Sequence, residues 1–546
     1  MTDPTGTLRA AHSWFLSPQQ RGNPATGVDR RHPGSAAFSR GNSVRPLIHG
    51  EEYFPALRAA VQAQRPGDLL LFTDWRGDPD ERLGQDSLTI VQLFSQAAAR
   101  GVVVKGLFWR SHWDRLAYSV EQNRSMSDDI RAAGGEVLLD MRVRPLGSHH
   151  QKFVVLRHPG REHLDVAFVG GIDLCHTRHD SAQHHGDPQP VPMAPVWSAR
   201  PPWHDAQVMV QGPAVGDIEY SFRERWNDPH KLAHDPVTLI DDTLHRDERH
   251  PQPMPPQGPD PQPVGTAAVQ VLRTYPAKRP RYPFAPLGER SIARAYDKAV
   301  GRAHGLVYLE DQYFWNPEVI SCFAQALRAQ PELRMILVLT AYAAQAGRLS
   351  SAANLISRTR TIAEILDAGG DRVGVYSIEN RSGTPVYVHS KVCVVDDVWA
   401  SVGSDNMNRR SWTHDSELTC AVVDEALDER EPHTVDGFGD GARVFARNLR
   451  LALAAEHLDR DLDDPSDIAD LLDPVSCFEA FARQAAQVQA WHEAGRGGPR
   501  PPGRLRPYRP SRYTGIQRVA AEAVYRFACD PDGRPWRMRL RPGSRF

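Results

Sequence analysis

The sequence predicts an α/β fold made of two pseudo-symmetric halves, each an α/β/α sandwich, packed face to face. Three observations lead to this prediction. Short apolar runs typical of strands alternate with helical patterns, and the alternation occurs twice along the chain. The order of elements is the same both times, which indicates an internal duplication. Each half ends on a strand that opens with the triplet H-x-K. A mostly helical extension is expected after the second half.

The first half is predicted to cover residues 44–243. It begins with a helix over roughly 51–64 and continues with strands near 69–73, 102–109 and 136–140 and from His150 onward. Residues 1–43, rich in Gly, Pro, Arg and Ser, are expected to form a flexible lead-in. A Pro-rich linker is predicted over 244–287. Seven prolines fall within residues 251–263, and proline excludes both a helix and a central strand.

The second half is predicted to cover residues 288–425 and to repeat the first at the same spacing. Its expected helices lie near 289–303, 319–329 and 352–367, and its strands near 306–310, 334–340, 373–378 and 387–396. From Leu69 to His150 the chain runs 81 residues, and from Leu306 to His389 it runs 83. The matching intervals support a duplication.

The C-terminal extension is predicted over residues 426–546, first helical and then rich in Arg and Pro. From residue 496 onward there are 13 Arg against 3 acidic residues. Three interpretations stay open for this tail. It could contact anionic lipid head groups, bind nucleic acid, or dock on acidic patches of the chain itself.

The two H-x-K triplets are the strongest functional signal. They are His150-Gln151-Lys152 and His389-Ser390-Lys391, and the chain has only six lysines. With 23 His, chance predicts about 0.25 such triplets, yet two occur at matching places in the two halves. Residues i and i+2 of a strand share a face, so each His and Lys should point to the same side. Two halves packed together would bring two imidazoles and two ammonium groups into one cleft.

This set of groups suits phosphoryl chemistry. Two lysines can neutralise the non-bridging oxygens of a phosphodiester and stabilise charge in the transition state. One histidine can attack phosphorus to form a phosphohistidine. The other can protonate the leaving alkoxide and then activate water, which is typically worth about 10²–10⁴-fold. No metal ion or other cofactor is expected.

These residues resemble the signature of the phospholipase D superfamily, H-x-K-x4-D followed by G-[SG]-x-[ND]. The second copy matches through His389, Lys391, Asp396 and the stretch Gly403-Ser404-Asp405-Asn406. The first copy departs from the signature, because Arg157 stands where the aspartate belongs and "GGID" follows it. Further stretches resemble the plant-type phosphatidylcholine-cleaving enzymes, namely "FVGGIDLCHTRHD", "PPWHDAQVMVQGPAVGDIEYSFRERWND", "VYLEDQYF" and "NRRSWTHDSEL". The resemblance covers roughly residues 45–425.

The resemblance implies roles for individual residues. His150 would be the nucleophile and His389 the acid/base, although the sequence alone leaves their order open. Lys152 and Lys391 would hold phosphate oxygens, with Asn406 and Ser404 as further donors. Asp173 and Glu417 are candidates to orient the two imidazoles, the alternative being turn or surface acids. Gly403, Gly171, Gln312 and Trp203 are candidate substrate contacts, with packing roles as the alternative, and Asp396 is assigned to the structural part of the motif.

Two other groups of residues, four histidines and six cysteines, are interpreted as structural and not as functional sites. Four histidines lie in "HTRHDSAQHHGD" at His176, His179, His184 and His185. Their spacing is irregular and no thiolate joins them, so a polar loop is favoured over a metal site. The six cysteines are scattered without a C-x-x-C pair and are interpreted as reduced core residues.

Composition and charge limit the kinds of partner that the protein is expected to bind. The net charge is −2, which argues against a general attraction to nucleic acid. No apolar run reaches membrane-spanning length and no secretory signal is evident, so a cytoplasmic or peripheral membrane location is expected, with signal-free export left open. The expected substrate is a glycerophospholipid at a membrane surface. Because both half-sites lie in one chain, a monomer is expected.

The sequence therefore predicts a phospholipase D that releases phosphatidic acid and a head group, with transfer to an alcohol through the same intermediate. Three alternatives remain: a nuclease or other phosphodiesterase with the same site, an exported antibacterial phospholipase held off by an immunity protein, and a non-catalytic lipid-binding descendant suggested by Arg157.

Overall fold

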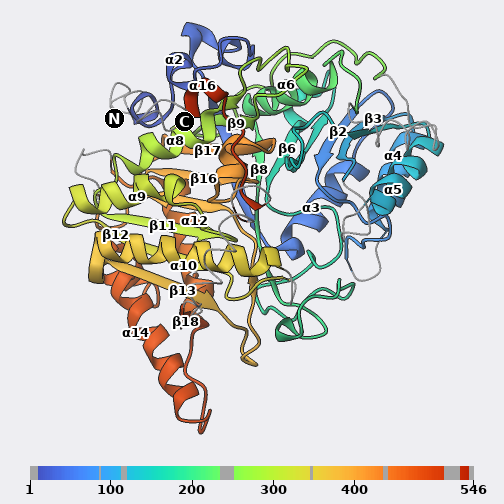
Figure 1. Ribbon diagram of the computed structural model, residues 1–546. Helices are drawn as coiled ribbons and strands as arrows, with labels where there is room; N and C mark the ends of the chain where they lie inside the picture. The colour runs from blue at the N-terminus through green and yellow to red at the C-terminus, as the bar shows by residue number, and fades with distance from the viewer. Residues whose placement is uncertain are drawn as a thin grey trace.

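The computed structural model describes residues 10–84, 88–111, 120–233, 251–344, 349–433, 441–509, 525, 529–539 and 546. Within these residues the chain forms one twisted, 16-stranded sheet with helices on both faces, together with a separate two-stranded ribbon (Figure 1). The strand order is β18-β13-β12-β11-β15-β16-β17-β9-β1-β8-β6-β5-β2-β3-β4, and β10 pairs with β9. The alternation of strands and helices along the chain thus yields the predicted α/β class.

Within its described residues, the first half supplies the strands from β1 to β8 and the four α-helices α3 to α6. The strands are β1 (Ser39–Ile48), β2 (Leu69–Asp74), β3 (Val103–Trp109), β4 (Glu136–Asp140), β5 (Phe153–Arg157), β6 (Val166–Gly170), β7 (Trp203–His204) and β8 (Ala206–Gln211). The helices are α3 (Gly50–Gln62), α4 (Ile90–Ala99), α5 (Val120–Ala132) and α6 (Ala214–Trp226). A capping box formed by Thr89 and Gln92 fixes the start of α4.

Among the residues that the structure describes, the second half supplies the strands from β9 to β17 and the four α-helices α8 to α11. The strands are β9 (Ala267–Tyr275), β10 (Glu289–Arg290), β11 (Leu306–Asp311), β12 (Arg334–Leu339), β13 (Val373–Ile378), β14 (Tyr387–Val388), β15 (Val392–Val395), β16 (Trp399–Gly403) and β17 (Glu417–Asp424). The helices are α8 (Ser291–Val300), α9 (Pro317–Ala329), α10 (Leu349–Gly369) and α11 (Arg409–Thr413).

The strand order is the same in both halves, read outward from the junction. The first half runs β1-β8-β6-β5-β2-β3-β4, and the second runs β9-β17-β16-β15-β11-β12-β13. In each, the last three strands are parallel and the others antiparallel. The halves meet where β1 pairs with β9, and β6 also contacts β17 across the junction. The duplication inferred from the repeated spacing is therefore present in the fold.

Residues alternate between two cores along each strand, as the period of two requires. On β2, Leu69 and Leu71 pack into a central core that spans both halves, and Leu70 and Phe72 pack beneath α3 and α4. On the equivalent strand β11, Tyr308 joins the central core, and its neighbours face α8 and α9. Helix α6 covers the central core from the first half. Each half therefore has three layers.

Two expectations about connecting segments are wrong. The described part of the lead-in, residues 10–38, is packed, because Trp14 and Phe15 are buried against α8 and β9. The Pro-rich segment contains neither helix nor strand over residues 251–264, but the proposed linker 244–287 also includes β9, a fully buried central strand. The apolar residues of β9 allow it to form a buried central strand, which the proline-rich residues before it cannot form.

The C-terminal extension is attached to both halves. Its elements are α12 (Val444–Leu458), α13 (Ala469–Leu472), α14 (Pro474–Glu493), β18 (Leu505–Pro507) and α16 (Trp536–Arg539). Helices α12 and α14 complete the central core, and β18 extends the sheet beside β13. Arg500 and Arg506 pair with Glu379, and Arg504 pairs with Asp459. The described part of the Arg-rich tail thus docks on acidic residues of the chain itself.

Two bulk expectations can be compared with the structure. Among the described residues, no helix combines the length and apolar character needed to cross a bilayer. Each of the six cysteines belongs to the described residues, is buried, and is outside any disulfide. The burial of the cysteines agrees with the sequence analysis.

Candidate active site

The two H-x-K triplets lie in equivalent extended segments just before β5 and β15. The strands themselves begin at Phe153 and Val392, three and five residues later than predicted, and the start of the second predicted strand is the separate short strand β14. Main-chain bonds nevertheless continue past the strand ends. Gly170 N–H donates to the carbonyl of Lys152 at 3.4 Å, and Gly403 N–H donates to that of Lys391 at 3.3 Å. The same contact in both halves fixes the two triplets in the same local geometry.

The first histidine is held by a carboxylate of the second half. Nδ1 of His150 lies 2.9 Å from Glu417, the first residue of β17. The Ser404 hydroxyl donates to the same carboxylate at 2.6 Å. His150 is the more accessible of the two imidazoles, with 15% of its side chain exposed. Because Nδ1 is engaged, Nε2 is the ring nitrogen left for chemistry.

The second histidine is held by a carboxylate of the first half. Nδ1 of His389 lies 2.7 Å from Asp205, and the Trp203 indole N–H donates to the same oxygen at 3.3 Å. The sequence analysis nominated Asp173 for this role, and that nomination is wrong. Asp173 pairs instead with Lys152 at 3.3 Å and Arg178 at 2.9 Å.

Strand register shows that the two carboxylates occupy equivalent positions. Gly170 faces Gln207 across the β6–β8 ladder, and Gly403 faces Thr419 across the β16–β17 ladder. Asp205 and Glu417 each lie two residues before those partners. Each carboxylate therefore crosses the junction to the histidine of the other half.

Electrostatic coupling shows that the two half-sites are close together. Burial, followed by Lys152 and Lys391, lowers the pKa of His150 well below its usual value. Burial, followed by Lys391 and Arg178, does the same to the pKa of His389. Burial also lowers the pKa of Lys391 to about 8. Lysines of both halves thus act on His150, and both imidazoles are neutral near pH 7 in the free protein.

The carboxylates respond to burial in the opposite sense. Burial and the nearby Asp415 raise the pKa of Glu417, and burial raises the pKa of Asp205 against the effect of Lys391 and Arg178. Burial opposes ionisation of Asp173, but Lys152 and Arg178 outweigh it and lower its pKa. Asp173 is thus the ionised partner of Lys152.

Aromatic side chains form one wall beside each histidine. Trp203 stacks on Tyr387 at a centroid distance of 4.7 Å and lies 5.0 Å from the His389 ring. The parallel pairing of β7 with β14 brings these residues of different halves together. Trp75 stands edge-on to His150 at 6.0 Å. Arg178 lies over the Trp203 ring at 4.1 Å.

The remaining predicted site residues differ in what they contact. Gln312 donates to the Tyr387 hydroxyl at 2.7 Å and so supports the aromatic wall. Gly171 lies so near Asp205 that an added Cβ would be 2.2 Å from its Oδ1. Asn406 is buried, and its Oδ1 has no hydrogen-bond partner among the described residues. Gly403 ends β16 beside Thr419.

Asp396, the aspartate of the second motif, and Arg157, which replaces it in the first motif, make different contacts. Asp396 accepts main-chain N–H bonds from His304, Gly305 and Leu306 at 2.7–2.8 Å, which ties it to the start of β11. Arg157 instead pairs with Asp165 at 2.8 Å and Glu219 at 2.5 Å. The first half therefore supports its strand through a buried ion-pair network and does not contact the site through this position.

Sequence reasoning missed Asp205, Arg178 and Trp75. Asp205 lies within the stretch "PPWHDAQVMVQGPAVGDIEYSFRERWND" quoted above, but no role was assigned to it. The distance from Asp173 to Asp205 is 32 residues, whereas that from the equivalent Asn406 to Glu417 is 11. A long insertion, residues 175–202, therefore hides the equivalence of the two carboxylates from any comparison of intervals. It also carries Arg178.

Comparison with known proteins agrees with this geometry. The Phospholipase D family model matches residues 80–320, and the model "Cardiolipin synthase, PLD-like domain" matches residues 298–431. Phospholipase D A of Dictyostelium discoideum is 28% identical over 76% of this chain and 35% of its own length. Phospholipase D alpha 1 of Cynara cardunculus is 25% identical over 71% of this chain and 60% of its own length.

Among solved structures, a phosphatidylserine synthase of Haemophilus influenzae aligns with 77% of this chain and 87% of its own, at 13% identity and a TM-score of 0.48. The chain spans from about a third to less than two thirds of the length of the curated relatives it matches.

The fold and the site define a duplicated α/β protein in which two H-x-K half-sites share one centre. The chain belongs to the phospholipase D superfamily, and its curated relatives include the plant-type members.

Proposed function

We propose that the protein is a phospholipase D-type phosphodiesterase that cleaves the distal phosphodiester of glycerophospholipids. One observation carries the proposal: two buried imidazoles, each held through Nδ1 by a carboxylate of the opposite half, lie in the field of the same two lysines. The similarity to phospholipases D of plants and Dictyostelium supports a lipid substrate.

In the first step, Nε2 of His150 attacks phosphorus while the bond from phosphorus to the head-group oxygen breaks. The leaving alkoxide takes a proton from Nε2 of His389, and the product is a phosphohistidine with a free head-group alcohol. Glu417 and Asp205 keep each Nδ1 engaged, so that Nε2 of each ring is the reactive atom.

In the second step, His389 removes a proton from water as the water oxygen attacks phosphorus. The N–P bond breaks, phosphatidic acid leaves, and His150 returns to its neutral form. A primary alcohol in place of water would give a phosphatidylalcohol by the same bond changes. Transfer to an alcohol is thus a direct consequence of a covalent intermediate.

The cations would hold the phosphate through both steps. Lys152 and Lys391 are both almost fully buried, so their charges are screened little by solvent. An anionic phosphate between them would restore charge balance and raise the pKa of His389, which favours the protonated acid for departure of the head group. Both half-sites lie in one chain, so a monomer acting peripherally at a lipid surface is sufficient.

The test is incubation of the pure protein with mixed micelles of phosphatidylcholine or phosphatidylethanolamine, with and without ethanol. Phosphatidic acid is expected without ethanol, and phosphatidylethanol should appear with it. His150→Ala is the matched inactive control. Parallel incubation with single- and double-stranded DNA separates lipid cleavage from nuclease activity. Absence of both lipid products from every head group would exclude the proposal.

A further inference from the structure

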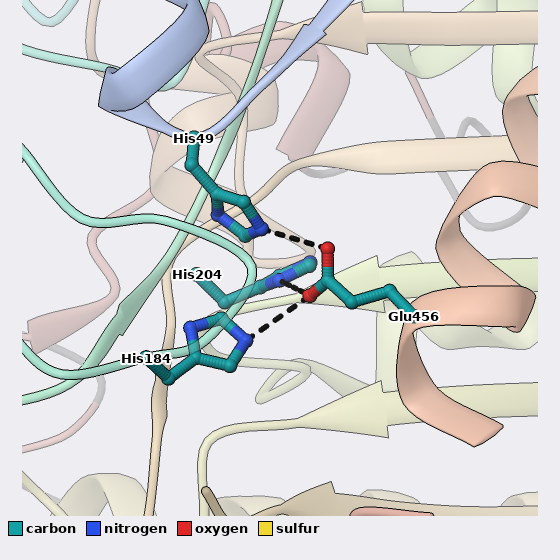
Figure 2. A group of neighbouring side chains, drawn as sticks. All are labelled: His49, His184, His204 and Glu456. Carbon is teal, nitrogen blue, oxygen red and sulfur yellow. Dashed lines mark hydrogen bonds and ion pairs between the residues drawn. The ribbon is translucent and has the colours of Figure 1, made fainter. Parts of the chain in front are cut away.

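A buried cluster of three histidines and one glutamate lies outside the active site. Its members are His49 at the start of α3, His184 in the 175–202 insertion, His204 in β7 and Glu456 in α12 (Figure 2). The three histidines are at most 3% exposed, and the Glu456 side chain is 8% exposed. The sequence analysis assigned His184 to a polar loop, and this burial shows that the assignment is wrong.

One nitrogen of each imidazole points at the same carboxylate. Nε2 of His49 lies 2.7 Å from Glu456 Oε2, and Nε2 of His184 and Nδ1 of His204 lie 3.0 and 3.1 Å from Oε1 (Figure 2). The four ligand atoms all lie within 4.8 Å of one another. The ligand atoms around one tetrahedral zinc ion are about 3.4 Å apart. The four side chains would therefore need to move their ligand atoms by little more than about 1 Å to bind an ion.

In each ring, the inner nitrogen is the one that faces Glu456, and the outer nitrogen is the other one. In two of the rings, the hydrogen bond of the outer nitrogen shows where the ring proton lies. Nδ1 of His184 lies 3.0 Å from the Trp203 main-chain carbonyl, and Nε2 of His204 lies 2.8 Å from Glu310. Both partners only accept hydrogen bonds, so each outer nitrogen must keep its proton. A neutral His184 ring then turns the lone pair of its inner nitrogen toward the lone pairs of Glu456, whereas His204, whose pKa Glu310 and Glu456 raise to about 10 against its burial, can donate from both nitrogens. A metal ion between them removes this conflict.

The surroundings match those of metal-binding histidines. Such histidines donate their outer N–H to a carbonyl or a carboxylate, as His184 and His204 do here. Glu310 also contacts Nε2 of His457 at 2.8 Å, and Nδ1 of His457 has no hydrogen-bond partner among the described residues. Nε2 of His457 can therefore donate to Glu310. Two buried carboxylates, Glu456 and Glu310, then balance one divalent cation.

The backbone is also bent at two of the ligands. His49 and His184 have φ angles of 69° and 54°, a region that non-glycine residues seldom occupy. Such conformations persist where the surrounding structure enforces them, often at binding sites.

We propose that His49, His184, His204 and Glu456 form a structural site for a divalent transition metal ion, with zinc as the best fit. Three imidazoles with one carboxylate match the ligand preference of zinc, and four protein ligands leave no open position for catalysis. The ion joins the first half to α12 of the C-terminal extension. It also fixes His204, whose main-chain carbonyl accepts the N–H groups of His389 and Ser390.

The direct test is elemental analysis of protein purified without a polyhistidine tag. Wild-type protein is expected to hold one zinc ion per chain after desalting. His184→Ala and Glu456→Gln should lose it, and His185→Ala, which changes the exposed neighbouring histidine, should keep it. A wild-type protein that takes up no zinc, cobalt, nickel or manganese after chelation and reloading overturns the proposal. That result would leave a cluster of imidazolium ions paired with Glu456 and Glu310.

A second measurement holds even if the variants fail to fold. Cobalt added to chelated wild-type protein should give the intense visible bands of a tetrahedral ion without thiolate ligands. Free zinc at a hundred times its dissociation constant should raise the apparent folding equilibrium constant about a hundredfold, seen as a higher melting temperature. Cobalt bands of octahedral type, or a melting temperature that zinc does not change, would contradict a closed four-ligand site. Neither readout depends on lipid cleavage.

Discussion

The two half-sites of this protein use the same parts but depend on each other for orientation. His150 and Lys152 enter from one half and His389 and Lys391 from the other, yet Glu417 holds the first imidazole and Asp205 the second. The halves differ around this shared plan. The first carries the 175–202 insertion, has Gly171 where the second has Ser404, and has Arg157 where the second has Asp396. The reacting centre is thus symmetric, and the supporting structure has diverged.

The largest expected effect comes from removing either imidazole. His150→Ala and His389→Ala should each lower lipid cleavage by about 10⁴-fold or more, because one forms the covalent bond and the other moves the proton. The two variants should differ in the intermediate. With an activated leaving group, His389→Ala should accumulate a phosphohistidine on His150, detected by rapid quench and mass spectrometry. An adduct on His389 in His150→Ala would reverse the two roles.

The next largest effect is expected at Asp205 and Glu417, the two carboxylates that each hold the histidine of the other half. Asp205→Asn and Glu417→Gln keep the shape but can hold the wrong tautomer, and each should cost about 10²–10⁴-fold in kcat with little change in KM. Similar losses in both variants would support equivalent tasks in the two halves. A loss confined to one variant would show that only one imidazole needs its carboxylate.

Gly171 and Ser404 test the divergence between the halves. Gly171→Ala places a methyl group against Asp205 and should lower activity by about 10²-fold through misplacement of His389. Ser404→Ala removes only one hydrogen bond to Glu417 and should cost about tenfold. Steady-state kinetics of the two variants, with circular dichroism as a check on folding, would measure the difference. The reverse ranking would contradict the close packing seen at Gly171.

The pH profile should depend on the lysine of the second half. Burial lowers the pKa of Lys391 to about 8, so its ammonium form is present below that pH and is lost above it. The value of kcat/KM should therefore fall about tenfold per pH unit above about 8. Lys391→Arg keeps its charge to much higher pH, so its lower activity should lack this alkaline decline. A decline unchanged in Lys391→Arg would assign it to another group.

The smallest effect on catalysis is expected at the divergent motif position. Arg157→Asp would remove the guanidinium that pairs with Asp165 and Glu219 and add a third carboxylate beside them, so it should lower the free energy of unfolding by about 3–5 kcal/mol. Asp396→Ala leaves three main-chain N–H groups unpaired and should cost about 3 kcal/mol. Activity per folded molecule should be unchanged in both. Urea denaturation together with kinetics would separate stability from chemistry.

Much of the fold and the centre of the site could be predicted from local patterns. The helix near 319–329 and the strand near 334–340 appear at nearly the predicted bounds, because periodicity and burial agree there. The two triplets stood out because lysine is rare in this chain. The packed segment 10–38 could not be predicted in the same way, since its polar composition conceals Trp14 and Phe15, which are buried by distant elements.

The orienting carboxylates and the histidine cluster were harder to predict for a related reason. Asp205 and His389 are 184 residues apart, and His184 and Glu456 are 272 apart. Such contacts depend on how the halves and α12 meet, which no local period encodes. Register between strands, available only from the structure, shows that Asp205 and Glu417 correspond.

The exchange of carboxylates between the halves has a consequence for the newly made chain. As the polypeptide leaves the ribosome, residues 1–243 emerge with His150 but without the acid that holds its ring. Glu417 can orient His150 only after β17 has been synthesised and has paired with β9. On the proposed function, a truncated product that stops before β17 would therefore have little activity toward phospholipids.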